Sequence, residues 1–172
     1  MTSVLTIDTL KENEKEAVGR LLVESYAQYK NSYAKLQDWL DYASDLAASV
    51  NNPNVAKFLV AKDGEEVLGT LQLFSDSEMA YNKPDLEIYS PIIRMLAVSP
   101  TARGKGIAQA LLKESINYAH EIGAKHIYLH TSDKMSKAIR LYEYLGFKRD
   151  TSKEFNKLNF LVKCYRLDIQ SF

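Results

Sequence analysis

An apolar strand that passes through two glycines into an amphipathic helix is the feature that most constrains the fold of this chain. Residues 92–98 (Ile-Ile-Arg-Met-Leu-Ala-Val) are mostly apolar, which is typical of a buried strand. Ser99-Pro100 ends that strand, and the sequence Arg-Gly-Lys-Gly-Ile-Ala at 103–108 opens a helix that we expect over residues 104–122. A buried strand that leads into a helix predicts an α/β fold, in which helices cover a central sheet.

The glycine turn also has the chemistry of an anion site. Glycines let backbone N–H groups approach a ligand closely, and a helix start adds unpaired N–H donors with a partial positive charge. The turn therefore predicts a cradle for phosphate or pyrophosphate, to which Arg103 and Lys105 add charge. A turn into a helix without any ligand is the alternative. A Walker A loop is excluded because Gly106 follows Lys105, and a Rossmann fingerprint is excluded because Gln109 replaces its third glycine.

Strand-like and helix-like segments alternate along the rest of the chain. Apolar, β-branched runs predict strands at 4–7, 57–61, 67–74, 126–131, 147–149 and 160–169, the second and third joined by a hairpin turn at Asp63-Gly64. Apolar stripes predict helices at 33–50, 104–122 and 134–145, and a first helix opened by Thr9 and Glu12 as a capping box. The polar segment 75–91 predicts a long loop. We expect one mixed α/β domain over residues 1–172.

Charge and composition exclude several classes of protein. The chain has 22 Lys and Arg against 22 Asp and Glu, so its net charge is zero, which argues against nucleic acid as a partner. We find no signal peptide and no run of 18 apolar residues, so we expect a cytoplasmic protein with no membrane partner. The single cysteine, Cys164, cannot form an internal disulfide, and its apolar surroundings predict a buried, inert thiol.

The three histidines do not predict a metal site. His126 and His130 fall on one face of a predicted strand, but four residues at about 3.3 Å each separate them by roughly 13 Å. One metal ion cannot bridge that distance. We therefore expect surface or packing roles for both side chains, and no metal.

The motifs resemble those of the GNAT-type N-acetyltransferases. Arg103-x-x-Gly106-x-Ala108 matches that family's Arg/Gln-x-x-Gly-x-Gly/Ala signature, and residues 94–100 look like its fourth strand. Residues 138–147 (Ala-Ile-Arg-Leu-Tyr-Glu-Tyr-Leu-Gly-Phe) look like its second cofactor motif. The resemblance implies a single-domain GNAT-like α/β fold, with a mixed central sheet of about six to seven strands flanked by about four helices.

This resemblance also implies an activity, a co-substrate and site residues. The activity is transfer of an acetyl group from acetyl-CoA to a primary amine, on a small molecule or a protein, by direct attack and without a metal. Tyr142 would stand near the thioester sulfur as general acid, although a tyrosine on a helical stripe is otherwise a core residue. The cofactor would be bound by the backbone of Leu96, Ala97 and Val98 at the pantetheine arm, and by Arg103, Gly104, Lys105, Gly106, Ile107 and Ala108 at the pyrophosphate. A homodimer is a candidate assembly.

Two positions depart from the family pattern. Ile92 stands where many relatives have a Glu that serves as base or holds water, and Met135 stands where an Asn commonly contacts the cofactor. The first departure leaves the base open. It also keeps a second reading open, a non-catalytic module of the same fold that binds or senses acyl-CoA.

In the fold that the resemblance implies, the segment 75–91 borders the acceptor groove, although an acidic loop of this kind is normally just solvated. Its carboxylates would favour cationic or neutral amines, and Glu87 is a candidate replacement for the missing base. The acidic residues of this segment are Asp76, Glu78, Asp85 and Glu87. On another wall, Tyr26, Tyr29 and Tyr33 either line the groove or pack.

Overall fold

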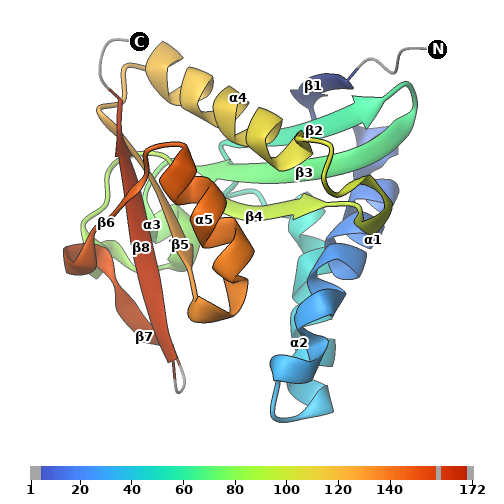
Figure 1. Cartoon of the computed structure of the whole chain (residues 1–172), viewed down its shortest axis with the longest axis horizontal. Helices are drawn as coiled ribbons and strands as arrows, with labels where there is room; N and C mark the ends of the chain where they lie inside the picture. Colours follow the sequence, from blue (N-terminus) through green and yellow to red (C-terminus); the bar gives the residue numbers. More distant parts are fainter. Residues whose placement is uncertain (1–4, 158–159, 170–172) are drawn as a thin grey trace. The chain divides into compact units, whose positions relative to one another are not determined.

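The computed structural model describes residues 5–157 and 160–169, and these residues form an α/β fold (Figure 1). The strands are β1 (Leu5–Thr9), β2 (Lys57–Asp63), β3 (Glu66–Phe74), β4 (Ile92–Val98), β5 (His126–Thr131), β6 (Lys148–Arg149), β7 (Phe155–Lys157) and β8 (Phe160–Asp168). The helices are α1 (Lys15–Tyr26), α2 (Leu36–Ala48), α3 (Ser77–Tyr81), α4 (Ile107–Glu121) and α5 (Ser136–Tyr144). The predicted fold class is confirmed.

The sheet is mixed, as predicted. Hydrogen-bonded neighbours follow the order β1-β2-β3-β4-β5-β8-β6, and β7 pairs with β8. β1 and β2 are antiparallel, and so are β5 and β8. β4 and β5 are parallel, with Ile92 opposite Tyr128 and Ile93 opposite Leu129. The described residues thus form eight strands, because the short strand β7 adds to those that the sequence predicts.

The described residues divide into two compact units. Unit 1 consists of residues 5–53, 57–72 and 95–112, and unit 2 consists of residues 54–56, 73–94, 113–157 and 160–169. The strands β3 and β4 and the helix α4 each contribute residues to both units.

Unit 1 has its core under the helix pair α1 and α2, which lie side by side in Figure 1. Val18, Leu22 and Leu46 are fully buried there. In the same unit, Gly69 allows the start of α4 to lie close to the backbone of β3. A Cβ built on Gly69 of β3 would lie 2.8 Å from Ile107 Cγ2 and 3.1 Å from the backbone oxygen of Ala97. The start of α4 therefore packs directly on the strand backbone, where no side chain fits.

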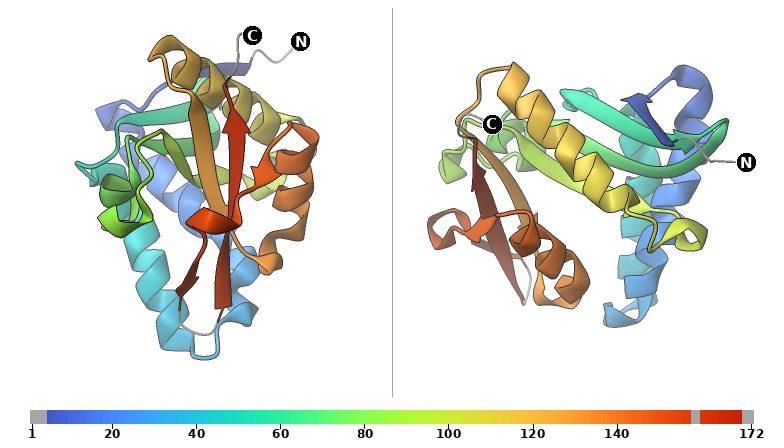
Figure 2. Two further views of the ribbon diagram at one scale, coloured as in Figure 1. Left: turned by 90° about the vertical axis from the view of Figure 1, so that its left-hand side faces the viewer. Right: turned by 45° about the horizontal axis from the view of Figure 1, so that its top comes forward.

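Unit 2 has its core around the paired strands β5 and β8, which run side by side in Figure 2 with β7 along one end of β8. One buried cluster joins these strands to the segment that precedes β4. Its members are Phe74, Ala80, Leu86, Ile88, Ile92, Tyr128 and Cys164.

The first helix begins differently from the prediction. Thr9 closes β1 and does not cap a helix. A 3-10 turn at Glu12–Glu14 precedes α1, and the Glu14 carboxylate accepts a hydrogen bond from the N–H of Lys11 at 2.9 Å. Glu14 is buried and forms an ion pair with Lys62 of β2. The cap is therefore fixed by a tertiary partner, which sequence spacing does not reveal.

The prediction of a long loop at 75–91 is wrong in part. The segment contains α3, whose Asp76 cap accepts a hydrogen bond from the N–H of Met79 at 2.8 Å, and a 3-10 turn at Pro84–Leu86. It is packed, because Leu86 and Ile88 are buried. A helix of five residues is too short to show a period.

The remaining differences are at element ends. α4 ends at Glu121, one residue before the predicted end, and Ile122 is 54% exposed. α2 and α5 are shorter than predicted because 3-10 turns occupy Ser49–Asn51 and Asp133–Met135. The predicted strand at 4–7 is β1, and its first residue lies outside the described residues. Across the described part of the chain, no helix has the length and apolar character needed to span a bilayer.

Candidate active site

The glycine turn between β4 and α4 has the backbone that the sequence predicts. Gly104 and Gly106 have φ angles of 82° and 77°, a region that side chains other than glycine rarely adopt. A Cβ built on either glycine would meet no protein atom within 4 Å. Glycine is therefore required here by the positive φ angles and not by contacts with neighbouring protein atoms. The face of the turn is open.

The side chains of the turn are divided between solvent and core. Arg103 and Lys105 are exposed, whereas Ile107 is buried against β3 and Ala108 is half-buried. The Arg103 guanidinium donates a hydrogen bond to the backbone oxygen of Ser25 at 3.1 Å. Arg103 thus ties the turn to the end of α1, a role that the sequence did not suggest.

The second half of β4 carries the predicted pantetheine partners. Met95 has a φ of 53°, so the backbone turns out of regular strand geometry at this residue. Beyond it, Ala97 is buried, and Leu96 and Val98 are half-buried. The Tyr26 hydroxyl donates a hydrogen bond to the backbone oxygen of Leu96 at 3.1 Å.

Tyr26 belongs to a cluster of aromatic rings in unit 1. Successive ring centroids lie 5.9 to 6.4 Å apart, and burial raises the pKa of the Tyr29 and Tyr33 hydroxyls. The rings are those of Tyr26, Tyr29, Tyr33, Trp39 and Tyr42. The three predicted tyrosines therefore all pack within this cluster, Tyr33 through Tyr42, and lining of an acceptor groove stays a prediction.

Tyr142 lies in unit 2, on α5. Its side chain is 5% exposed, and its ring centroid lies 6.1 Å from that of Phe147. After the helix, Gly146 takes a φ of 101°, and a Cβ there would lie 3.3 Å from Leu167 Cδ1 of β8. The end of α5 is thus packed on the sheet, and Tyr142 is sheltered from water. Whether Tyr142 is a core residue or a general acid stays a prediction.

His130 of unit 2 is enclosed by polar contacts. Its Nε2 lies 3.0 Å from the backbone oxygen of Lys153, so this nitrogen carries the proton. Its Nδ1 then accepts the hydrogen bond of the Tyr81 hydroxyl, also at 3.0 Å. Burial, aided by the nearby charge of Arg94, lowers the pKa of His130 to about 4. His130 is therefore a neutral packing residue, while His126 pairs with Asp168 at 2.8 Å.

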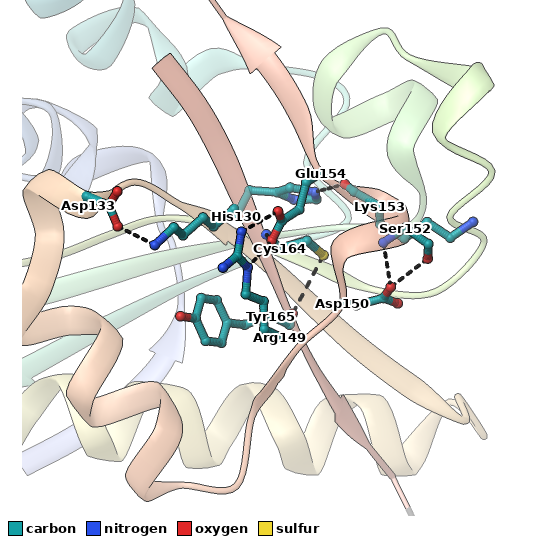
Figure 3. A network of polar contacts seen from close by, with 10 residues as sticks. His130, Asp133, Arg149, Asp150, Ser152, Lys153, Glu154, Cys164 and Tyr165 are labelled. Carbon is teal, nitrogen blue, oxygen red and sulfur yellow. Dashed lines mark hydrogen bonds and ion pairs between the residues drawn. The ribbon is translucent and has the colours of Figure 1, made fainter.

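Glu154 holds a network that the sequence did not predict (Figure 3). Its carboxylate accepts two hydrogen bonds from Arg149, at 2.7 and 2.8 Å, and one from the N–H of Cys164 at 3.1 Å. The bonds from Arg149 lower the pKa of Glu154. The Cys164 side chain is buried, as predicted, and burial raises the pKa of its thiol. The only sequence signal for the ion pair of Arg149 and Glu154 is their separation by five residues.

The segment 75–91 is held by two cations. Arg94 donates to the backbone oxygen of Ala80 at 2.6 Å, and its guanidinium lies 4.8 Å from the ring centroid of Tyr81. Lys153 donates to the backbone oxygens of Leu86 and Glu87.

Ile92, which stands where many relatives have a Glu, is 0% exposed, so its side chain is buried and offers no polar group to a substrate. Among the residues that the structure describes, no three His, Cys, Asp or Glu side chains are grouped so that they could hold a metal ion.

Known proteins of one family resemble this chain in sequence and fold. The profile of the acetyltransferase (GNAT) family matches residues 16–147. The uncharacterized N-acetyltransferase YhfO of Bacillus subtilis (strain 168) is 31% identical over 147 residues, which cover 86% of this chain and 92% of that protein.

N-acetyltransferase 8B of Rattus norvegicus is 31% identical over 121 residues, 66% of this chain. The chain spans about half the length of that relative, 52%. The structure of the paia N-acetyltransferase from Thermoplasma acidophilum in complex with coenzyme A shares the fold, with a TM-score of 0.66 at 17% identity over 94% of this chain and 98% of that one. With the predicted motifs in place on this fold, the chain belongs to the acetyltransferase (GNAT) family.

Proposed function

We propose that this chain transfers an acetyl group from acetyl-CoA to a primary amine, on a small molecule or a protein. The observation that carries this proposal is the open turn at 104–106, where two glycines with positive φ face no protein atom within 4 Å. It precedes a helix of 15 residues, whose N–H groups and dipole favour an anion. A pyrophosphate group fits these features in charge, and the open backbone of the turn leaves its N–H groups accessible.

The backbone supplies the other proposed contacts to acetyl-CoA. The strand residues Leu96, Ala97 and Val98 would pair with the pantetheine arm as an added strand does. The Leu96 oxygen accepts a hydrogen bond from Tyr26 and keeps a second lone pair for such pairing. Met95, with its positive φ, marks where β4 departs from regular geometry just before these residues.

Acetyl-CoA, when bound, supplies an acetyl group activated as a thioester. Tyr142 Oη is the proposed proton donor to the departing sulfur. A free thiol has a pKa near 8.5, so the thiolate can also leave without a proton, and Tyr142 assists a step that is already feasible. Direct attack by the amine needs no protein nucleophile, which agrees with the burial of Cys164.

The amine must be neutral to attack, and the buried Ile92 offers no base at that position. Glu87 is the proposed alternative, because its backbone is fixed in a left-handed conformation with a φ of 54° and anchored by Lys153. The carboxylates of the 75–91 segment favour cationic or neutral acceptors over acidic ones. The same lack of a base at Ile92 favours the second candidate function, a non-catalytic module that binds or senses acyl-CoA.

Thiol release across a panel of amines tests the proposal. The panel should contain monoamines, diamines, amino acids, and peptides with free amino termini. We expect thiol release above the rate of hydrolysis for at least one cationic or neutral amine. Binding of acetyl-CoA with no release for any amine would support the sensing module. Best specificity constants for carboxylate-rich acceptors would contradict the role given to the acidic segment.

A further inference from the structure

Thr131, the last residue of β5, carries a buried hydroxyl with no protein partner. Its side chain is 5% exposed, and none of the described residues forms a hydrogen bond with its Oγ1. Thr70 behaves differently. It is fully buried, and its hydroxyl donates to the backbone oxygen of Leu59 at 2.8 Å. Since a buried hydroxyl without a partner destabilises a fold, the Thr131 hydroxyl is the kind of group that a ligand satisfies.

The face of the sheet on which Thr131 lies follows from the strand register. Thr131 is two residues from Leu129 and four from Ile127, so the three side chains share one face of β5. Across the ladder, Ile127 is opposite Leu167 of β8, whose Cδ1 lies 3.3 Å from the Cβ position of Gly146 at the end of α5. Thr131 therefore faces the side of the sheet that α5 covers.

Tyr142 is on that same helix, only four residues before Gly146. His130, in contrast, faces the other side of the sheet, where it accepts the hydrogen bond of Tyr81. Thr131 also stands at the carboxyl end of β5, which runs parallel to β4, and ligands of α/β sheets bind at the carboxyl ends of parallel strands. The hydroxyl of Thr131 therefore lies on the face of unit 2 that is covered by α5, the helix that carries Tyr142.

We propose that the Thr131 hydroxyl donates a hydrogen bond to the sulfur of acetyl-CoA, and after transfer to the sulfur of coenzyme A. This inference rests on the function proposed above. The hydroxyl keeps its proton, and no bond to Thr131 forms or breaks. A hydrogen bond to a thiolate is stronger than one to a thioester, because the acceptor is charged. Thr131 would therefore stabilise the departing sulfur beside Tyr142.

Binding of coenzyme A and of desulfo-coenzyme A, which lacks the sulfur, to Thr131→Val isolates this contact. Valine keeps the shape of threonine and removes only the hydroxyl. We expect calorimetry to show affinity for coenzyme A reduced about 10-fold, with affinity for desulfo-coenzyme A unchanged. Thr131→Ser, which keeps the hydroxyl, should retain the preference for the sulfur-bearing ligand.

Thermal unfolding without ligand supplies an independent readout. Thr131→Val removes a hydroxyl that has no partner, so its Tm should be equal to or higher than that of the parent chain. Thr70→Val is the matched control, because it removes a hydroxyl that donates to Leu59. Its Tm should fall, and its preference for coenzyme A should stay unchanged.

Three results would overturn the inference. Equal weakening of both ligands would assign Thr131 a structural role, and no weakening would leave the sulfur without this contact. A Tm loss like that of Thr70→Val would place the partner of the hydroxyl inside the protein. If the parent chain bound neither ligand, the proposed function would fall first, so the two failures are distinguishable.

Discussion

Acidification from pH 7 to pH 5 should destabilise the protein through His130. The ring is held neutral by burial, with a pKa of about 4 when folded against 6.5 for the exposed side chain. The unfolded chain takes up a proton as the pH falls through 6.5, whereas the folded chain does not until about 4. The stabilisation is thus complete above pH 6.5 and is lost progressively below it.

The size of the effect follows from the two pKa values. Each unit of pKa difference is worth about 1.4 kcal/mol, and the part that lies between pH 7 and pH 5 amounts to about 2 kcal/mol. Glu14 and Glu154 have pKa values lowered from 4.5 by their ion pairs, so their stabilisation is lost only in more acidic solution. These two carboxylates therefore contribute little between pH 7 and pH 5, and the His130 variant measures the share of the histidine.

Urea unfolding followed by circular dichroism at the two pH values measures this loss. In His130→Gln, the amide can still accept from Tyr81 and donate to the Lys153 oxygen, but it does not titrate. We expect the pH dependence of its unfolding free energy to be smaller than the parent's by about 2 kcal/mol. His120→Gln, on the exposed side of α4, is the control. A variant that keeps the full pH dependence, or an NMR titration of His130 with a midpoint near 6.5, would refute the reasoning.

Two further variants test the proposed site. Gly106→Val should weaken coenzyme A binding by about 10-fold or more, because a β-branched residue at positive φ costs about 1–3 kcal/mol and displaces the turn. Gly64→Val has the same strain in the β2–β3 hairpin and should bind normally, and equal affinities in calorimetry would contradict the site. Tyr142→Phe should bind coenzyme A normally and turn over roughly 10-fold more slowly. An unchanged rate, with chemistry shown to be rate-limiting, would make Tyr142 a core residue.

Elements that a local sequence pattern determines have the structure that the sequence predicts. β4 and β5 have the predicted bounds because an apolar run ends at a proline in one case and follows a helix-ending glycine in the other. The glycine turn was equally predictable, since residues other than glycine rarely adopt the φ angles found at 104 and 106. In each case, residues adjacent in sequence supply all the information.

The features that the sequence does not predict all depend on tertiary contacts. Glu14 takes over the cap of the first helix because Lys62, far along the chain, neutralises it. Glu154 contacts Cys164 because β7 pairs with β8, and no hydrophobic periodicity in the sequence predicts this pairing. The burial of Thr131 cannot be predicted locally, because a polar residue at the end of an apolar strand is normally solvated. Its burial arises from tertiary packing, which the sequence alone does not predict.

The aromatic cluster of unit 1 gives this chain an unusual optical property. Trp39 is the only tryptophan, and it is buried among the rings of Tyr33 and Tyr42. Its fluorescence therefore reports on unit 1, and unfolding of that unit exposes the indole ring to water. The ring signals of His130 report on unit 2. Coincident midpoints from the two probes would mean that both units unfold as one cooperative system, and separate midpoints would assign each unit its own stability.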